Sequence, residues 1–209
     1  MRRVSRRDFL ATGSIALGTL PLVRSTEVFA QTSDAAFRHG VASGDPLIDR
    51  VILWTRVTPR STTGSTRVSW TIASDPKLAQ VVGRGETQTG AARDFTVKVD
   101  VTGLEAGTTY YYRFEAEGAR SAIGRTRTLP AAGVARVRLG VVSCSNWPQG
   151  YFNAYAGLAR RPDLDAVLHL GDYIYEYANA EYGDGTAIGR IPSPNKEILA
   201  LEDYRGRHA

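Results

Sequence analysis

The chain has 209 residues and a formal net charge of +5, a length that allows one large domain or two small ones. Both signs of charge are interspersed after residue 30, which excludes the basic stripe typical of a nucleic-acid-binding domain. The single cysteine, Cys144, has no second cysteine in this chain with which to form an intramolecular disulfide. The fold must therefore rely on its hydrophobic core.

Residues 1–30 have the three parts of a secretory signal. A basic start is followed by an apolar stretch from Leu10 to Val23 and by a small-residue exit at residues 28–30. The sequence SRRDFL at residues 5–10 matches the twin-arginine pattern, and Gly, Ser and Thr dilute the apolar stretch. We therefore predict a signal peptide that the twin-arginine (Tat) export machinery reads, and a periplasmic or extracellular protein.

Removal of this signal changes the charge and the membrane prediction. Five Arg leave together with Asp8 and Glu27, so 21 basic and 19 acidic residues remain, a net charge of +2. The apolar stretch is shorter than the ~20 residues that span a bilayer, so we expect no transmembrane helix in the exported protein. Because the Tat route carries folded proteins, commonly with a metal or cofactor, the signal is indirect evidence for a cofactor.

Between residues 37 and 130 the sequence predicts a small antiparallel β-sandwich. β-forming residues cluster in four runs that Gly and Pro separate, at residues 51–55, 67–72, 95–99 and 109–115. In the second run Val68, Trp70 and Ile72 alternate with polar residues, which predicts one inward face. We expect Trp54 and Trp70 in the core rather than on a carbohydrate-binding surface.

A leucine, a glycine turn and a run of tyrosines follow one another in residues 101–114. This order resembles the fibronectin-type sandwich. We predict that Leu104 fills the core and that Tyr110 is a corner residue whose hydroxyl bonds to the nearby backbone.

After a linker at residues 131–133 the pattern changes to strand, helix, strand. Residues 137–143 and 166–170 are apolar runs, and residues 151–159 between them have the pattern of a short amphipathic helix. Such a unit predicts two parallel strands joined by a right-handed crossover.

The ends of these two strands carry a thiol, a carboxylate and a phenol. Cys144 follows the first strand, Asp172 follows the second, and Tyr175 lies three residues further along. Because the carboxyl ends of parallel strands meet at one edge of the sheet, these side chains should converge. Alone, Cys144 would be a small buried hydrophobe and Asp172 a cap or turn residue. Together they favour a metal site, whose anionic oxygens suit Fe(III) while the thiolate adds a softer bond.

Several stretches of the sequence carry a family resemblance. They are GVASGDP at residues 40–46 with LWTR at 53–56, VVSCS at 141–145, HLGDYIYEY at 169–177 and LEDYR at 201–205. They resemble the PhoD-like alkaline phosphatases, a branch of the calcineurin-type metallophosphoesterases. Most of that superfamily has Asp-x-His and Gly-Asp-x-x-Asp in its first two metal motifs. This chain has Ser-Cys and Gly-Asp-x-x-Tyr instead, which is the feature of the PhoD-like branch.

The resemblance implies a fold and a set of metal ligands. The fold is a fibronectin-type β-sandwich at residues 37–130, followed by the first βαβ part of an α/β metallophosphoesterase domain at residues 134–209. Asp172 would bridge two metals, and Cys144 and Tyr175 would bind Fe(III), with Ca(II) in the neighbouring positions. The implied activity is that of an alkaline phosphatase or phosphodiesterase acting on a phosphate-ester substrate, and we expect a monomer.

Three polar residues are kept out of the predicted site. Asp45 lies in a Gly-Asp-Pro turn, where an aspartate bonds its own backbone, and His39 precedes the same turn. His169 alternates away from Asp172 along the strand, and we expect it to be a packed histidine.

The family's motifs for the second metal do not occur before Ala209, so we expect the chain to be an N-terminal portion of a longer phosphoesterase. Residues 178–194 are rich in Gly, Pro and charge, which predicts a long loop beside the site. The alternative function is an exported β-sandwich module that binds a cell-wall polymer or a protein, without catalytic activity and without iron.

Overall fold

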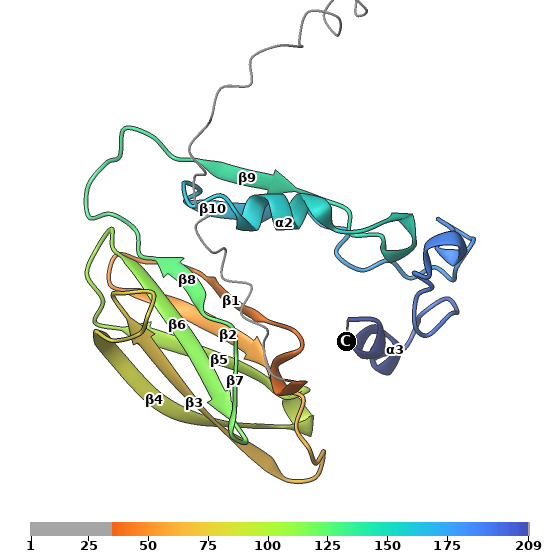
Figure 1. Ribbon diagram of the computed structural model, residues 1–209, viewed down its shortest axis with the longest axis horizontal. Helices are drawn as coiled ribbons and strands as arrows, with labels where there is room; N and C mark the ends of the chain where they lie inside the picture. Colours follow the sequence, from red (N-terminus) through yellow and green to blue (C-terminus); the bar gives the residue numbers. More distant parts are fainter. Residues whose placement is uncertain (1–34, 209) are drawn as a thin grey trace, which may run out of the picture.

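The computed structural model describes residues 35–208. The predicted signal peptide at residues 1–30, and hence its recognition by the Tat machinery, lies outside the described residues. Two regions follow each other along the chain, a β-sandwich and a smaller region of mixed strands, helices and loops (Figure 1). Within residues 35–208 no helix combines the length and the apolar character needed to cross a membrane.

The sandwich consists of two antiparallel sheets. The three-stranded sheet has the order β1 (Val41–Gly44), β2 (Arg50–Arg56) and β5 (Thr96–Thr102). The five-stranded sheet has the order β4 (Val81–Gly90), β3 (Ser65–Ala73), β6 (Thr109–Ala116) and β7 (Ala119–Arg120), and β8 (Gly124–Arg127) also pairs with β6. Two short 3-10 turns complete this region, η1 (Ala35–Phe37) and η2 (Ala91–Arg93).

The core of the sandwich lies between the sheets and comes from alternate residues of the strands. Strand β2 buries Val51, Leu53 and Thr55, and β6 buries every second residue from Tyr110 to Ala116. This is the period of two that the sequence predicted, because successive side chains of a strand point to opposite faces. Each fully buried large apolar side chain contributes about 1.5–3 kcal/mol relative to its exposed state.

The predicted corner residue is confirmed. Leu104 lies in the core with 8% of its surface exposed, and the buried Tyr110 hydroxyl accepts a hydrogen bond of 2.9 Å from the backbone N–H of Glu105. This contact fixes the turn before β6 to the start of the strand that follows it.

The longest strand, β4, is one that the sequence did not predict. Its residues are mostly polar or Gly, and it lies at the edge of the five-stranded sheet. Trp70 of β3 is paired with Gly85 and covers it, and a Cβ at Gly85 would lie only 2.8 Å from the Trp70 ring. Trp70 is half-buried over this glycine and packs against the core from the face that Val68 and Ile72 share, as the alternating pattern predicted. Trp54 was also expected in the core, but on β2 it alternates with the buried Leu53 and Thr55 and therefore lies on the opposite face, half-buried.

The smaller region contains the predicted strand–helix–strand unit. Strands β9 (Leu139–Val142) and β10 (Ala166–His169) are parallel, with Val142 opposite His169, and α2 (Asn153–Ala159) lies between them in sequence. Each element is shorter than predicted. The rest of the region holds η3 (Trp147–Gln149), η4 (Thr186–Ile188) and α3 (Leu201–His208). Residues 178–194 form a loop with η4 as its one helical turn, as expected.

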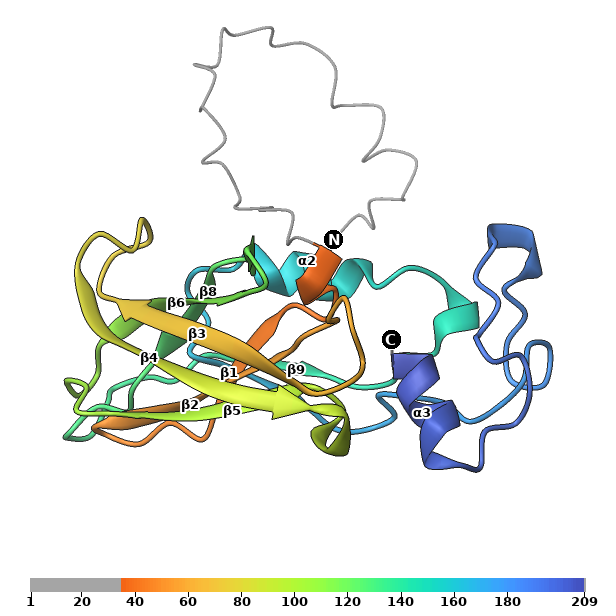
Figure 2. The same ribbon diagram turned by 90° about the horizontal axis from the view of Figure 1, so that it is seen from below.

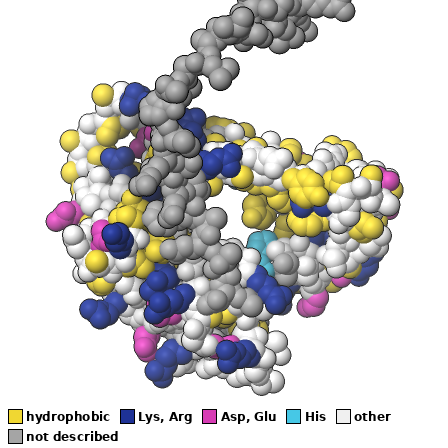
Figure 3. Space-filling model, viewed as in Figure 1, with side chains coloured by type: hydrophobic (Ala, Val, Ile, Leu, Met, Phe, Trp, Pro, Cys, Tyr) yellow, Lys and Arg dark blue, Asp and Glu magenta, His cyan; other side chains and the backbone are white. Residues whose placement is uncertain are grey.

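Polar contacts join the two regions. Arg127 forms an ion pair of 2.9 Å with Asp165, and Arg125 donates a hydrogen bond of 2.6 Å to the carbonyl of Pro162. Helix α3 lies beyond the end of the sandwich (Figure 2), and the His39 ring stacks on the His208 ring with centroids 5.6 Å apart. Between these contacts the space-filling view is hollowed, with a histidine at the edge of the opening (Figure 3).

Candidate metal centre

The three predicted metal ligands come together at the carboxyl ends of β9 and β10. The Cys144 Sγ lies 3.6 Å from the Asp172 Oδ2, and the Tyr175 hydroxyl donates a hydrogen bond of 3.0 Å to the same oxygen. The Asp172 carboxylate is therefore the centre of the group. The parallel pairing of the strands is what brings residues 28 positions apart to one edge of the sheet.

The backbone of both loops is held in an unusual conformation. Cys144 has φ +65° and Asp172 has φ +54°, in the left-handed region that costs a non-glycine residue on the order of 1–2 kcal/mol. The loops hydrogen-bond to each other, because the Cys144 N–H donates to the Gly171 carbonyl (3.1 Å) and the Ser145 N–H to the Asp172 carbonyl (2.7 Å). These bonds continue the strand pairing and hold both predicted ligands in the strained conformation, a pattern associated with functional sites.

The chemistry of the donors fits a metal cation. The hydrogen bond to Cys144, followed by the contact with Asp172, raises the pKa of the Tyr175 phenol, so that it stays protonated. None of the ion pairs among residues 35–208 involves Asp172. A multivalent cation would neutralise this accumulation of anionic donors and lower the pKa of the phenol.

The third donor of the set is a tyrosine. Across residues 35–208 no three His, Cys, Asp or Glu side chains gather in one place, so Tyr175 completes the group that Cys144 and Asp172 begin. Carboxylate and phenolate oxygens favour a hard cation, and the thiolate supplies one softer bond.

The loop at residues 178–194 packs against this site. The Tyr182 ring stacks on the Tyr175 ring with centroids 5.7 Å apart and planes inclined by 21°. The Asn146 side-chain amide donates a hydrogen bond to the Tyr182 carbonyl. The loop therefore touches both the segment after Cys144 and the predicted ligand Tyr175.

Arg190 anchors the C-terminal part of the same loop to residues 147–152. Its guanidinium lies 3.3 Å from the centroid of the Trp147 ring and about 5 Å from the rings of Tyr151 and Phe152. Its Nε donates to the Trp147 carbonyl at 3.0 Å, and 8% of its surface is exposed. A buried cation–π contact of this kind contributes about 2 kcal/mol.

Asp45 and His39, which were kept out of the predicted site, lie away from it, and His169 packs beside it with hydrogen bonds that the sequence did not predict. Asp45 is exposed in a turn with φ +47°, and His39 contacts Arg56 and His208. The half-buried His169 ring packs against the rings of Tyr155 and Tyr173, as expected, and also hydrogen-bonds through both nitrogens, to the Gly171 N–H and to hydroxyl groups. The sequence contained one signal for these hydrogen bonds, a polar residue at the end of an apolar strand and shortly before Gly171 and Asp172.

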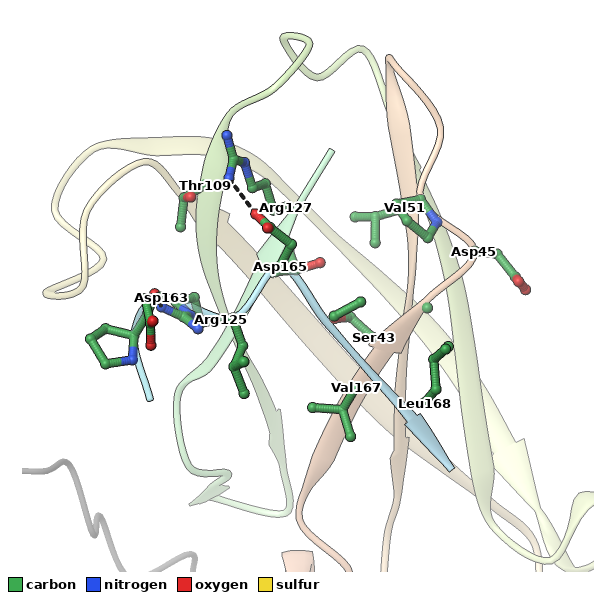
Figure 4. A pocket seen from close by; sticks show the side chains of 16 residues that line it. Ser43, Asp45, Val51, Thr109, Arg125, Arg127, Asp163, Asp165, Val167 and Leu168 are labelled. Atoms are coloured by element: carbon green, nitrogen blue, oxygen red, sulfur yellow. Dashed lines mark hydrogen bonds and ion pairs between the residues drawn. The ribbon is translucent and has the colours of Figure 1, made fainter. Parts of the chain in front are cut away.

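A cavity of about 420 Å³ lies at the other end of β10, away from the predicted ligands. It is enclosed by β1 and β8 of the sandwich and by residues 162–168, and Arg127 reaches across it to Asp165 (Figure 4). Arg127 pairs with Asp165 across the cavity, and Arg125 donates to the carbonyls of Arg161 and Pro162, so the cavity forms the junction of the two regions rather than an extension of the site.

Comparison with known proteins identifies the family. Two family models match, "PhoD-like phosphatase, N-terminal domain" over residues 23–130 and "PhoD-like phosphatase" over residues 139–209. The chain belongs to the PhoD-like phosphatase family. It is 39% identical over 221 residues to alkaline phosphatase D of Bacillus subtilis (strain 168), a match that covers 98% of this chain and 37% of that protein.

A solved structure of PhoD supports the same relationship. It superposes with a TM-score of 0.77 at 40% identity, over 83% of this chain and 34% of that one. This PhoD-like chain thus shares the fold of a known PhoD and spans 37% of the length of its curated relative.

Proposed function

We propose that this PhoD-like chain supplies the Cys-Asp-Tyr side of the active site of a secreted, metal-dependent phosphoesterase that hydrolyses phosphate esters. The observation that carries the proposal is the convergence of Cys144, Asp172 and Tyr175 on one carboxylate oxygen. The similarity to alkaline phosphatase D supports the reaction class. Alkaline phosphatase and phosphodiesterase activity are both consistent with it.

The role of each side chain follows from its contacts. Asp172 presents one oxygen to both Cys144 and Tyr175, and its carboxylate would be shared between two metal ions. Cys144 and Tyr175 would bind Fe(III), and Ca(II) would occupy the neighbouring position. Metal ions bound here would act as Lewis acids on the phosphoryl oxygens. The Cys144 thiol and the Tyr175 hydroxyl each hold a proton against Asp172, so these residues must lose protons when they bind metal, and loading should increase with pH.

The organisation of the chain belongs to the same proposal. Residues 37–130 would form a fibronectin-type domain, which the Tyr110 corner supports, and residues 134–209 would belong to the metallophosphoesterase domain, which the parallel β9–β10 pair supports. A Tat signal at residues 1–30 would direct a monomeric protein to the periplasm or the extracellular space.

Metal analysis with an absorption spectrum tests the proposal. The longest reading frame that contains the chain is expressed with its signal, as wild type and as Cys144→Ala, Tyr175→Phe and the control Tyr177→Phe, which alters an exposed tyrosine two residues from the site. We expect near-stoichiometric iron and a visible phenolate-to-iron band in the wild type and the control, both weakened in the two site variants. Release of a chromogenic phenol from its phosphate ester should fall in parallel.

If the protein contains no iron, and if the absorption spectrum and the turnover are the same in all four forms, the metal site proposed for this chain is wrong. Binding of cell-wall polymer or protein without turnover would then favour the binding-module alternative.

A further inference from the structure

Three side chains beside the candidate metal centre form a closed hydrogen-bonded triangle. The Tyr155 hydroxyl lies 2.8 Å from the His169 Nε2, the Ser145 hydroxyl lies 3.2 Å from the same nitrogen, and the two hydroxyl groups contact each other. Ser145 is buried, and Tyr155 and His169 are half-buried. The side-chain oxygens and the ring nitrogen thus satisfy one another.

The backbone determines which nitrogen of His169 carries the proton. The His169 Nδ1 lies 3.2 Å from the Gly171 backbone nitrogen. A backbone N–H can only donate, so Nδ1 must accept, and in the neutral imidazole the proton must then reside on Nε2. The His169 Nε2–H therefore donates, with the Tyr155 oxygen as its nearer acceptor at 2.8 Å and the Ser145 oxygen at 3.2 Å. Neither hydroxyl group can donate to this nitrogen, and in the contact between the two hydroxyl groups either one can be the donor.

The three members come from three different elements. Ser145 directly follows Cys144, Tyr155 lies in α2, and His169 ends β10, three residues before Asp172. The triangle therefore joins both ligand-bearing loops to the helix that crosses between them. The Tyr155 ring also packs against Phe152 and His169, with centroids 5.7 and 6.0 Å away.

We infer that Ser145, Tyr155 and His169 form a positioning network that fixes the separation of Cys144 and Asp172. The backbone hydrogen bonds between the two loops fix the position of one loop against the other along the strand direction. The side-chain triangle fixes the distance of both loops from α2. The consequence for metal binding rests on the proposed function, because a rigid outer shell keeps ligands in place and its loss commonly costs 10–100-fold in metal affinity.

The first test uses Cys144 as a reporter in metal-free protein. It is the chain's only cysteine and it is exposed, so an aromatic disulfide reagent measures it alone. In the wild type the Cys144 Sγ lies 3.6 Å from the Asp172 Oδ2, so the loop holds the thiol against the carboxylate and restricts the approach of the reagent. Tyr155→Phe should release the loop and raise the reaction rate at least threefold. The control Tyr151→Phe, which removes an exposed hydroxyl bonded only to the Ile188 carbonyl, should react at the wild-type rate.

Nitrogen NMR of ¹⁵N-histidine-labelled protein reads the network directly. The wild type should show His169 with a proton on Nε2 alone. Because the Gly171 N–H still bonds to Nδ1 in Tyr155→Phe, this variant should keep the same tautomer, and its Nε2 resonance should shift because the Nε2–H has lost the Tyr155 oxygen as its acceptor. The chain has three histidines, and the signal that disappears in His169→Gln gives the assignment.

Two substitutions of His169 separate positioning from simple packing. A Gln amide places a donor near the Nε2 position and can keep the bond to Tyr155, whereas an Asn amide can keep only the bond to the Gly171 N–H. His169→Gln should therefore keep the thiol rate and the metal affinity within about threefold of wild type, and His169→Asn should lose about tenfold in metal affinity. If Tyr155→Phe does not fold, this pair carries the test.

The outcomes also separate this inference from the proposed function. A wild-type thiol rate and an unchanged His169 Nε2 resonance in Tyr155→Phe, or equal behaviour of the Gln and Asn variants, would overturn the network. Wild-type protein that takes up no Fe(III) would overturn the proposed function, and the thiol rates would still decide the network.

Discussion

The β-sandwich and the region after residue 138 are held together by different kinds of contact. In the sandwich, apolar side chains from both sheets form one continuous buried cluster from Phe37 to Ala116. Within residues 139–208, Ile198 is the one large aliphatic side chain that is fully buried. Both strands of the parallel pair expose apolar side chains, as do their flanks: Val137, Leu139, Val141, Val167, Leu168 and Leu170.

What holds the second region is a set of specific polar and aromatic contacts. The triangle around His169, the Arg190 stack on Trp147 and the bonds between the two ligand loops each fix a particular geometry. Non-directional burial stabilises a fold, whereas directional contacts define where individual atoms lie. The stability of the fold and the placement of the predicted ligands therefore depend on separate parts of this chain.

The largest expected effect comes from the sandwich core. Phe114 is fully buried and packs edge-on against Tyr112, with ring centroids 6.1 Å apart. Phe114→Ala should lower the free energy of unfolding by about 3–5 kcal/mol, because it removes apolar contacts and leaves a cavity. Urea unfolding followed by tryptophan fluorescence measures the loss. A change below 1 kcal/mol would mean that the sandwich core does not dominate stability.

A matched substitution compares the two regions directly. Val68→Thr places a hydroxyl in the fully buried core, and should cost about 1–3 kcal/mol. Val141→Thr makes the same change on β9, where the side chain is 57% exposed, and should cost less than about 0.5 kcal/mol. The same urea titration serves for both variants. Equal losses of unfolding free energy in the two variants would show that Val141 is buried in the protein in solution. The two regions would then not differ in how their apolar side chains are buried.

An ion pair at the edge of the sandwich gives a smaller effect that depends on pH. Arg56 donates two hydrogen bonds, of 3.0 and 2.9 Å, to the Asp94 carboxylate and holds its pKa below the usual value. A carboxyl group with a lowered folded pKa stabilises the fold above its unfolded pKa, and that contribution disappears as pH falls through the folded value. Asp94→Asn should therefore cost about 1 kcal/mol at pH 7, and the difference from wild type should shrink steadily as the pH falls below about 3.9, the ordinary pKa of an aspartate.

The control for this pair is Asp49→Asn. Asp49 pairs with Arg50 at 3.4 Å on the open surface, where such contacts contribute about 0–1 kcal/mol. Thermal unfolding of both variants across pH 2–7 separates them. A constant difference between Asp94→Asn and wild type over the whole range would show that the ion pair does not cause the stabilisation.

The sequence predicted those parts of the fold whose signal is local. Strand β6 and its corner tyrosine follow from a period of two and a Leu–Gly–Tyr order, and the β9–α2–β10 unit follows from apolar runs at the right spacing. Strand β4 was missed because Gly83 and Gly85 have no side chain with which to show periodicity, and it is Trp70 on the neighbouring strand that covers them.

The candidate site divides in the same way. Cys144, Asp172 and Tyr175 could be placed together because parallel topology fixes where strand ends meet. Ser145 and Tyr155 could not be linked to His169, since that requires knowing which face of α2 turns toward β10. Arg190 lies 43 residues from Trp147, and nothing in the sequence between them indicates the contact.

The parallel pairing of β9 and β10 also has a consequence for the order of folding. Antiparallel neighbours such as β3 and β4 can zip together from a short turn, but a parallel pair must first close the loop that contains α2, a slower event. Asp172 and Tyr175 are close in sequence and can meet early, whereas Cys144 joins them only after that closure. The thiol of Cys144 should therefore be the last of the three predicted ligands to arrive, and a cation present during folding would meet only the oxygen donors first.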